Sequence, residues 1–103
     1  MLLMKHNDTG KLIRHVIAYN IRSLRIESGQ SQAKFSEMVG INRSYMNQIE
    51  HGTKNMSIDK LMRIADGLDV PITRLFAGLE DCAPHKLPAD SIYALVKLPE
   101  IEE

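Results

Sequence analysis

Residues 43–51 place hydrogen-bonding side chains on one face of a predicted helix and apolar side chains on the other. On a helical wheel of about 100° per residue, Tyr45, Met46 and Ile49 cluster on one side. The opposite face holds polar groups without a carboxylate, which are Arg43 at its edge, Ser44, Asn47, Gln48 and His51. A guanidinium can pair with guanine and an amide with adenine. The chemistry that this pattern favours is the reading of base edges in DNA.

Two short helices and the turn between them are expected to position this face. Ser31 is a good N-cap for a helix over residues 32–39, and Gly40 suits the left-handed conformation that ends such a helix. Asn42 is placed to cap a second helix over residues 43–50. A short helix, a turn that contains Gly and a second helix form a helix-turn-helix, which presents its second helix to the major groove.

The remaining pattern predicts an all-α domain of five helices with a short C-terminal tail. Apolar residues recur every three or four positions from Ile13 to Leu24, which predicts a first helix over about residues 9–28. Ser57 caps a fourth helix, which Gly67 and Asp69 end, and Pro71 opens a short fifth helix. We expect residues 1–8 to form an irregular lead, 9–78 the DNA-binding domain and 79–103 an acidic tail.

Composition and charge limit the class of protein. The 103 residues hold 13 basic and 13 acidic side chains, but the basic excess lies in residues 11–77 and the acidic excess in residues 78–103. A modestly basic body can meet a polyanion. The single Cys82 cannot form an internal disulfide, and no stretch approaches the ~20 apolar residues of a membrane span. We therefore expect one small cytoplasmic domain that does not contact a membrane.

Residues 17–77 resemble the lambda-repressor-like helix-turn-helix family, also called the XRE or phage-repressor family. The resemblance rests on Gln32, Gly40, Ile41, the run Glu50-His51-Gly52, and the pattern Ser57-Ile58, Leu61, Ile64-Ala65 and Leu68. It implies direct base contacts by Arg43, Ser44, Asn47 and Gln48. It also implies an internal ion pair between Arg25 and Glu50, which ties the first helix to the third. Ser36 departs from the family, which usually has Ala there.

A second set of residues is predicted to hold the DNA backbone. The family commonly has a glutamine that binds phosphate at the position of Gln32, where free N–H groups at the helix start would add to it. The full set of candidates is Gln32, Tyr45, His51, Lys54 and Asn55. Tyr45 is expected to lie in the core with its hydroxyl at the rim. His51 either binds phosphate when it gains charge or stays a neutral surface side chain.

The first helix carries a second apolar face that a domain of this size does not need internally. Leu12, Val16, Tyr19 and Ile26 belong to this face. Because exposed apolar stripes usually mark a partner, we expect it to pack against the tail around Ile92 and Leu95, a second copy of the chain, or both. Helix-turn-helix proteins read two half-sites about 34 Å apart as dimers, which favours a homodimer.

The sequence offers no constellation for catalysis, for a metal or for a cofactor. The four histidines and Cys82 lack metal-ligand spacing, and no nucleophile set or phosphate loop is recognisable. The expected function is therefore not that of an enzyme. It is sequence-specific binding to a double-stranded DNA operator by a small transcriptional regulator, a repressor or autoregulator of controller-protein or antitoxin type, without a small-molecule effector. The alternative is a protein–protein interaction module of the same fold, against which the lack of outward apolar anchors argues.

Overall fold

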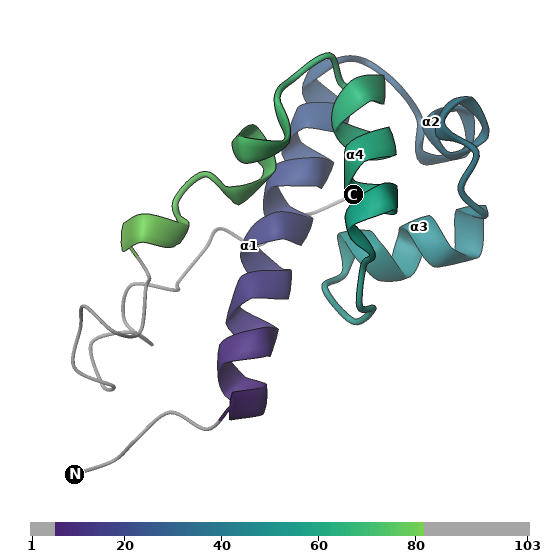
Figure 1. Ribbon diagram of the computed structural model, residues 1–103. Helices are drawn as coiled ribbons and strands as arrows, with labels where there is room; N and C mark the ends of the chain where they lie inside the picture. The colour runs from purple at the N-terminus through teal and green to yellow at the C-terminus, as the bar shows by residue number, and fades with distance from the viewer. Residues whose placement is uncertain (1–5, 82–103) are drawn as a thin grey trace, which may run out of the picture.

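Four α-helices and two 3-10 helices make up the part of the chain that the computed structural model describes, residues 6–81 (Figure 1). They are α1 (His6–Glu27), α2 (Gln32–Val39), α3 (Arg43–Glu50), α4 (Ile58–Gly67), η1 (Ile72–Phe76) and η2 (Leu79–Asp81). No strand occurs among these residues, so the predicted all-α class is confirmed.

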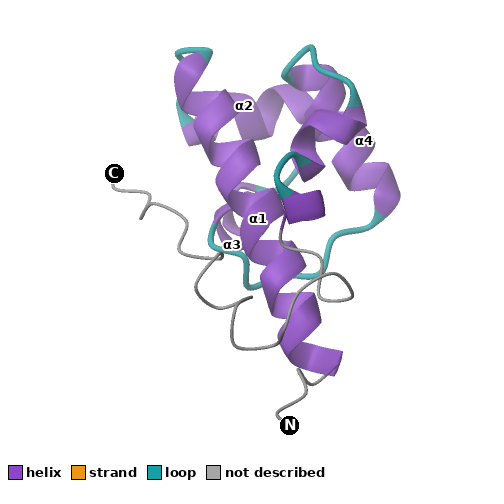
Figure 2. Cartoon of the chain, turned by 90° about the vertical axis from the view of Figure 1, so that its left-hand side faces the viewer, coloured by secondary structure: helices purple, strands orange, loops and turns teal. Residues whose placement is uncertain are grey.

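The long helix α1 organises the arrangement of the others. It packs against α3 and against η1, while α2 contacts both α3 and α4 (Figure 1). The N-terminal turns of α1 project beyond the other described helices in both views (Figure 1 and Figure 2). The helix-turn-helix formed by α2 and α3 is thereby held on one side of α1.

One hydrophobic core joins all of these elements. Its members come from α1, α2, α3, α4 and η1, and those with no exposed surface are Ile21, Phe35, Met46, Ile49, Ile64 and Leu75. Each helix supplies these side chains at helical spacing, as the hydrophobic pattern predicts. Burial of the apolar sides of α2 and α3 leaves their polar sides on the surface.

The predicted caps set the helix boundaries around the turn. Ser31 Oγ accepts a hydrogen bond from the backbone N–H of Lys34 at 3.1 Å, and Asn42 Oδ1 accepts one from Tyr45 at the same distance. Gly40 ends α2 in the left-handed conformation, with φ of 73°. The predicted bounds of α2 and α3 are confirmed because these signals are local.

The ends of the domain differ from the prediction in three ways. Helix α1 begins at His6, three residues before the predicted start at Thr9, since the apolar pattern that predicts this helix begins only at Ile13. The fifth element is not an α-helix but the 3-10 helix η1, in which Arg74 N–H bonds Pro71 O at 2.9 Å. A further 3-10 helix, η2, lies in the segment predicted as tail.

The side chain of Asn20 accounts for the shape of the chain around η1. Its Nδ2 donates to the carbonyl oxygens of Leu75 and Ala77, at 2.8 and 3.0 Å. Carbonyls at the end of a short helix need such partners, and α1 provides them from the middle of its length. These bonds attach the end of η1 and the residue after it to α1.

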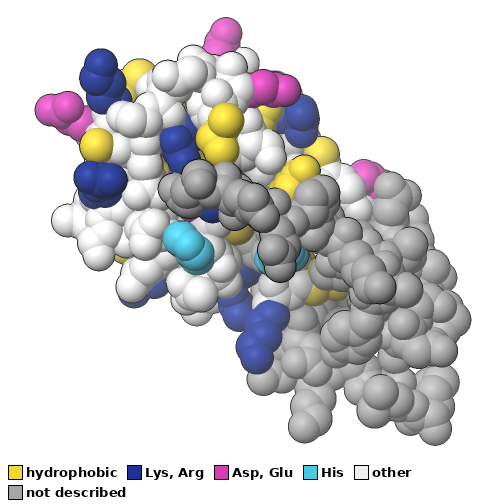
Figure 3. All heavy atoms as spheres, turned by 180° about the vertical axis from the view of Figure 1, so that it is seen from behind, with side chains coloured by type: hydrophobic (Ala, Val, Ile, Leu, Met, Phe, Trp, Pro, Cys, Tyr) yellow, Lys and Arg dark blue, Asp and Glu magenta, His cyan; other side chains and the backbone are white. Residues whose placement is uncertain are grey.

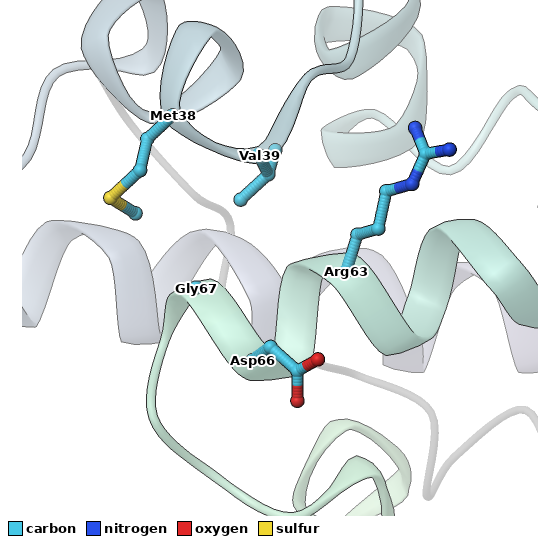
Figure 4. Close-up of a pocket in the computed structure, with 5 residues that line it drawn as sticks. All are labelled: Met38, Val39, Arg63, Asp66 and Gly67. Atoms are coloured by element: carbon cyan, nitrogen blue, oxygen red, sulfur yellow. The ribbon is translucent and has the colours of Figure 1, made fainter.

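Gly67 allows α4 to approach α2 closely. It is the last residue of α4 and lies beneath Met38 and Val39, which point toward it from α2 (Figure 4). A Cβ on Gly67 would lie 2.5 Å from Val39 Cγ1 and 3.1 Å from Phe35 Cε1. The left-handed position after α4 belongs to Asp69, with φ of 58°. Gly67 is thus required for packing and not for a positive φ.

The second apolar face of α1 is largely covered within the single chain. Leu12 and Val16 are 5% and 3% exposed, and Tyr19 is half-buried. Ile26 of the same face is 50% exposed, so this part of the face stays open to a partner. The predicted tail partners Ile92 and Leu95 lie outside the described residues. Among the described helices, none has the length and apolar character needed to cross a bilayer.

Candidate nucleic-acid interface

Helix α3 has the two-sided character that the wheel predicts. Met46 and Ile49 have no exposed surface and anchor the helix in the core. The predicted base-contact residues all lie on the exposed side, which comprises Arg43, Ser44, Asn47 and Gln48, followed by His51 at the C-cap. Helix α3 therefore offers a continuous polar surface of donors and acceptors to a ligand that approaches from outside.

The predicted ion pair between Arg25 and Glu50 is present and buried. Arg25 Nε lies 2.7 Å from Glu50 Oε2, and Arg25 Nη2 lies 3.0 Å from Glu50 Oε1. The two residues are 6% and 3% exposed, and Arg25 Nη1 also donates to the carbonyl oxygen of Gln30. This two-pronged pairing fixes the C-terminal end of α3 to α1.

Gln32 connects this ion pair to the exposed face of α3. Its Nε2 donates to Glu50 Oε1 at 3.1 Å and to Asn47 Oδ1 at 3.4 Å. The amide nitrogen that was expected to reach a phosphate is thus directed at α3. A phosphate contact at this position is left to the backbone N–H groups at the start of α2, because the side-chain oxygen of Gln32 can only accept a hydrogen bond.

An open hollow lies where the first turns of α2 and α3 meet. It is lined by Gln32, Arg43, Ser44 and Asn47, which are four of the residues that the sequence singles out. The positive ends of two helix dipoles and the guanidinium of Arg43 favour negative or electron-rich groups there. The hollow can therefore receive a phosphate oxygen or the acceptor atoms of a base edge.

A basic rim surrounds Tyr45 at the other end of the motif. Tyr45 is half-buried, as expected, and its hydroxyl donates to the carbonyl oxygen of Asn55 at 2.9 Å. The ammonium groups of Lys54 and Lys60 lie 5.3 and 5.0 Å from the centre of its ring. Arg14 of α1 donates to Asn55 Oδ1 at 3.1 Å. These contacts hold three cations around the loop between α3 and α4.

Sequence reasoning missed two members of this rim, Lys60 and Arg14. Lys60 lies in the first turn of α4, three residues after the predicted cap Ser57. This spacing could have indicated that Lys60 lies near the loop before α4. Arg14 is 41 residues from Asn55 in the chain, so only the fold brings the two together.

His51 ends α3 with its ring turned back on the helix. Its Nδ1 lies 2.8 Å from the carbonyl oxygen of Asn47, which can only accept, so Nδ1 carries the proton. Nε2 is the ring nitrogen that stays available to a ligand. Within the described part of the chain, no cluster of His, Cys, Asp or Glu has the arrangement of a metal site.

Charges are unevenly spread over the surface of the described domain. In the view from behind, the acidic side chains lie in the upper part of the described surface, whereas Lys and Arg side chains occur in both its upper and lower parts, and its lower edge shows basic side chains alone (Figure 3). This arrangement matches the basic excess in residues 11–77. A surface of this kind attracts a polyanion to one side of the domain.

The fold and this surface define the class of protein. A family model described as a helix-turn-helix domain matches residues 18–80, which is more than half of the chain. The chain belongs to this family, as a member of its lambda-repressor-like class.

Relatives within the family are transcriptional regulators and control proteins. The chain is 38% identical over 65 residues to the HTH-type transcriptional regulator RamB of Mycobacterium tuberculosis, covering 63% of this chain but only 14% of RamB. It is 34% identical over 77 residues to the control protein C.BamHI of Bacillus amyloliquefaciens, covering 72% of this chain and 95% of that protein.

One solved structure shows a related fold together with DNA. The restriction-modification controller protein C.Esp1396I, a tetramer in complex with its natural 35 base-pair operator, superposes with a TM-score of 0.59 at 26% identity. The match covers 67% of this chain and 91% of the controller protein.

Proposed function

We propose that this chain binds double-stranded DNA in a sequence-specific manner and acts as a small transcriptional regulator of the controller-protein type. The observation that carries the proposal is the exposed polar face of α3, anchored beneath by Met46 and Ile49. Such a face offers donors and acceptors to base edges once the helix enters the major groove. The operator-bound controller protein of similar fold supports the same mode of binding.

The proposed contacts follow from the positions of the side chains. Base contacts are assigned to Arg43, Ser44, Asn47 and Gln48, which are all exposed on α3. Phosphate contacts are assigned to the two ends of the motif, namely Gln32 through its backbone N–H, His51, Lys54, Asn55, and the added residues Lys60 and Arg14. Tyr45 acts by holding the loop, because its hydroxyl proton is already donated to Asn55.

The regulator is proposed to act as a homodimer. A single module of this size makes few phosphate contacts, so it would bind weakly and with little selectivity. Two copies would read half-sites about 34 Å apart. Occupancy of the operator would then change the access of RNA polymerase, and concentration together with dimerisation would control the response.

A binding experiment tests this function. A pool of random-sequence duplexes is selected with the purified chain, and the enriched duplex is compared with a scrambled duplex of equal length. We expect a preference of about a thousandfold or more for the enriched duplex and a steep loss of affinity with rising salt. Failure to enrich any sequence would contradict the proposal, and the variant Arg43→Ala provides an internal control that should lose the preference.

A further inference from the structure

We propose that Gln32 fixes the side-chain amide of Asn47 so that Asn47 presents only its amino group to DNA, which makes one operator position selective for guanine over adenine. The inference rests on the proposed function and adds the kind of base that one side chain reads. It starts from three hydrogen-bonded residues, Glu50, Gln32 and Asn47.

Glu50 determines which groups donate and which accept in this series of hydrogen bonds. Its two carboxylate oxygens are held by Arg25, and a carboxylate in such a pair offers only acceptors. Gln32 must therefore turn its amino group, and not its oxygen, toward Glu50 Oε1, which lies 3.1 Å away. Because Arg25 and Glu50 are buried, this orientation is set by the interior of the domain.

The same amino group of Gln32 also determines how the side-chain amide of Asn47 is oriented. An amide nitrogen has two hydrogens, and the second points to Asn47 Oδ1 at 3.4 Å. A donor facing Asn47 requires the oxygen of Asn47 on that side. The amide of Asn47 is planar, so its Nδ2 is directed away from Gln32, and both residues line the hollow together with Arg43 and Ser44. No described residue accepts a hydrogen bond from Nδ2.

The bases differ in the hydrogen-bond acceptors that they present to the amino group of Asn47. Adenine is read by an asparagine that donates to N7 and accepts from the N6 amino group at the same time. Asn47 cannot do both while its oxygen is bound to Gln32. Guanine presents two acceptors, N7 and O6, which suit the two hydrogens of Nδ2, and cytosine presents only a donor. Thymine presents one acceptor, O4, so guanine, which presents two, is the base that the held amide favours.

The experiment uses the duplex that the wild-type chain selects from the random pool. Asn47→Ala first identifies the base pair that Asn47 reads, as the position where selectivity is lost. Binding is then measured with guanine and with adenine at that position. We expect the wild type to prefer guanine over adenine by about fivefold or more, because both bases offer N7 but only guanine offers a second acceptor, O6.

Gln32→Met tests the role of Gln32, because methionine has a similar length and makes no such hydrogen bonds. The freed amide of Asn47 can then turn to read adenine, so the guanine-to-adenine preference should fall by about fivefold at this position alone. Glu37→Met, an exposed change on the same helix, should leave the preference unchanged. Asn47→Asp, which keeps the contact to Gln32 but offers an oxygen outward, should shift the preference to cytosine.

Distinct results overturn the inference and the proposed function. A wild-type preference for adenine, an unchanged preference in Gln32→Met, or a uniform loss of affinity without a change in preference would each overturn the role given to Gln32 and Asn47. These results leave sequence-specific binding intact. A pool that enriches no sequence would overturn the proposed function, and this inference with it.

Discussion

Gly67 of α4 lies so close to Val39 of α2 that an added Cβ would come within 2.5 Å of Val39 Cγ1. The same Cβ would meet Phe35, which has no exposed surface and cannot move away. The packing of α4 on α2 therefore depends on the absence of a side chain at this one position (Figure 4).

Gly67→Ala is expected to destabilise the domain by about 1–3 kcal/mol, because overpacking outweighs the gain of up to about 1 kcal/mol in helix propensity. Denaturant unfolding followed by circular dichroism measures the change. Gly10→Ala on α1 is the matched control, since its Cβ would meet only the flexible end of Arg14. That variant should be stabilised, and equal effects of the two substitutions would contradict the packing argument.

Ser36→Ala should stabilise the domain, by about 1 kcal/mol. Ser36 is 2% exposed and its Oγ has no hydrogen-bond partner within the structure described. An unsatisfied buried hydroxyl carries a desolvation penalty that alanine removes, and alanine also favours the helix.

Ser57→Ala is the same chemical change as Ser36→Ala but should destabilise the domain. Ser57 Oγ accepts from the backbone N–H of Lys60 at 3.2 Å, so its loss should cost about 1 kcal/mol. Thermal melts of both variants check the pair. A lower melting temperature for Ser36→Ala would show that its hydroxyl has a partner or a packing role.

Local signals explain why the sequence predicts the helix-turn-helix so closely. Ser31, Gly40 and Asn42 each act on residues within four positions, so their effects can be inferred without a fold. The outward face of α3 follows from helical spacing alone. The contacts that hold the end of η1 could not be predicted, because Asn20, which binds the carbonyl oxygen of Leu75, is 55 residues from it in the chain.

The contacts within the candidate site could not be predicted from local patterns for the same reason, because they join residues that are far apart in the chain. The pairing of Arg25 with Glu50 was reached through resemblance, since 25 residues separate them and no local pattern joins them. The bond from Gln32 to Glu50 needs α2 and α3 to be packed before it can form. Sequence reasoning found which residues matter there but gave Gln32 an outward contact.

Glu50→Ala should destabilise the domain by about 3–5 kcal/mol, because it leaves the Arg25 guanidinium buried without its carboxylate. The change removes no base-contact side chain, although it frees Gln32, which Glu50 orients toward Asn47. Chemical denaturation of Glu50→Ala, Arg25→Ala and the double variant measures the coupling. Losses that simply add would contradict the pairing, and an unchanged melt of Glu50→Ala would show that the contact contributes nothing to stability.

Asn20→Ala should loosen η1 while leaving the helix-turn-helix folded. The substitution frees the carbonyl oxygens of Leu75 and Ala77 from their bonds to Nδ2, at a cost of about 1–3 kcal/mol. Hydrogen exchange should speed up first in residues 72–78. Asn20→Asp should be worse, because its oxygens cannot donate to the two carbonyls. Equal protection in wild type and Asn20→Ala would show that η1 is held by apolar contacts alone.

Lys60→Ala should reduce the salt dependence of DNA binding without changing which sequence is preferred. Lys60 and Lys54 flank the Tyr45 ring beside the loop after α3, where a phosphate strand would pass once α3 occupies the groove. Each phosphate contact contributes about 0.9 to the slope of log affinity against log salt concentration, so the slope should become shallower by about that amount. Arg74→Ala is the control, since Arg74 lies on η1, which packs on α1 and α4. If Arg74→Ala changed the slope and Lys60→Ala did not, the DNA would have to lie along a different side of the domain.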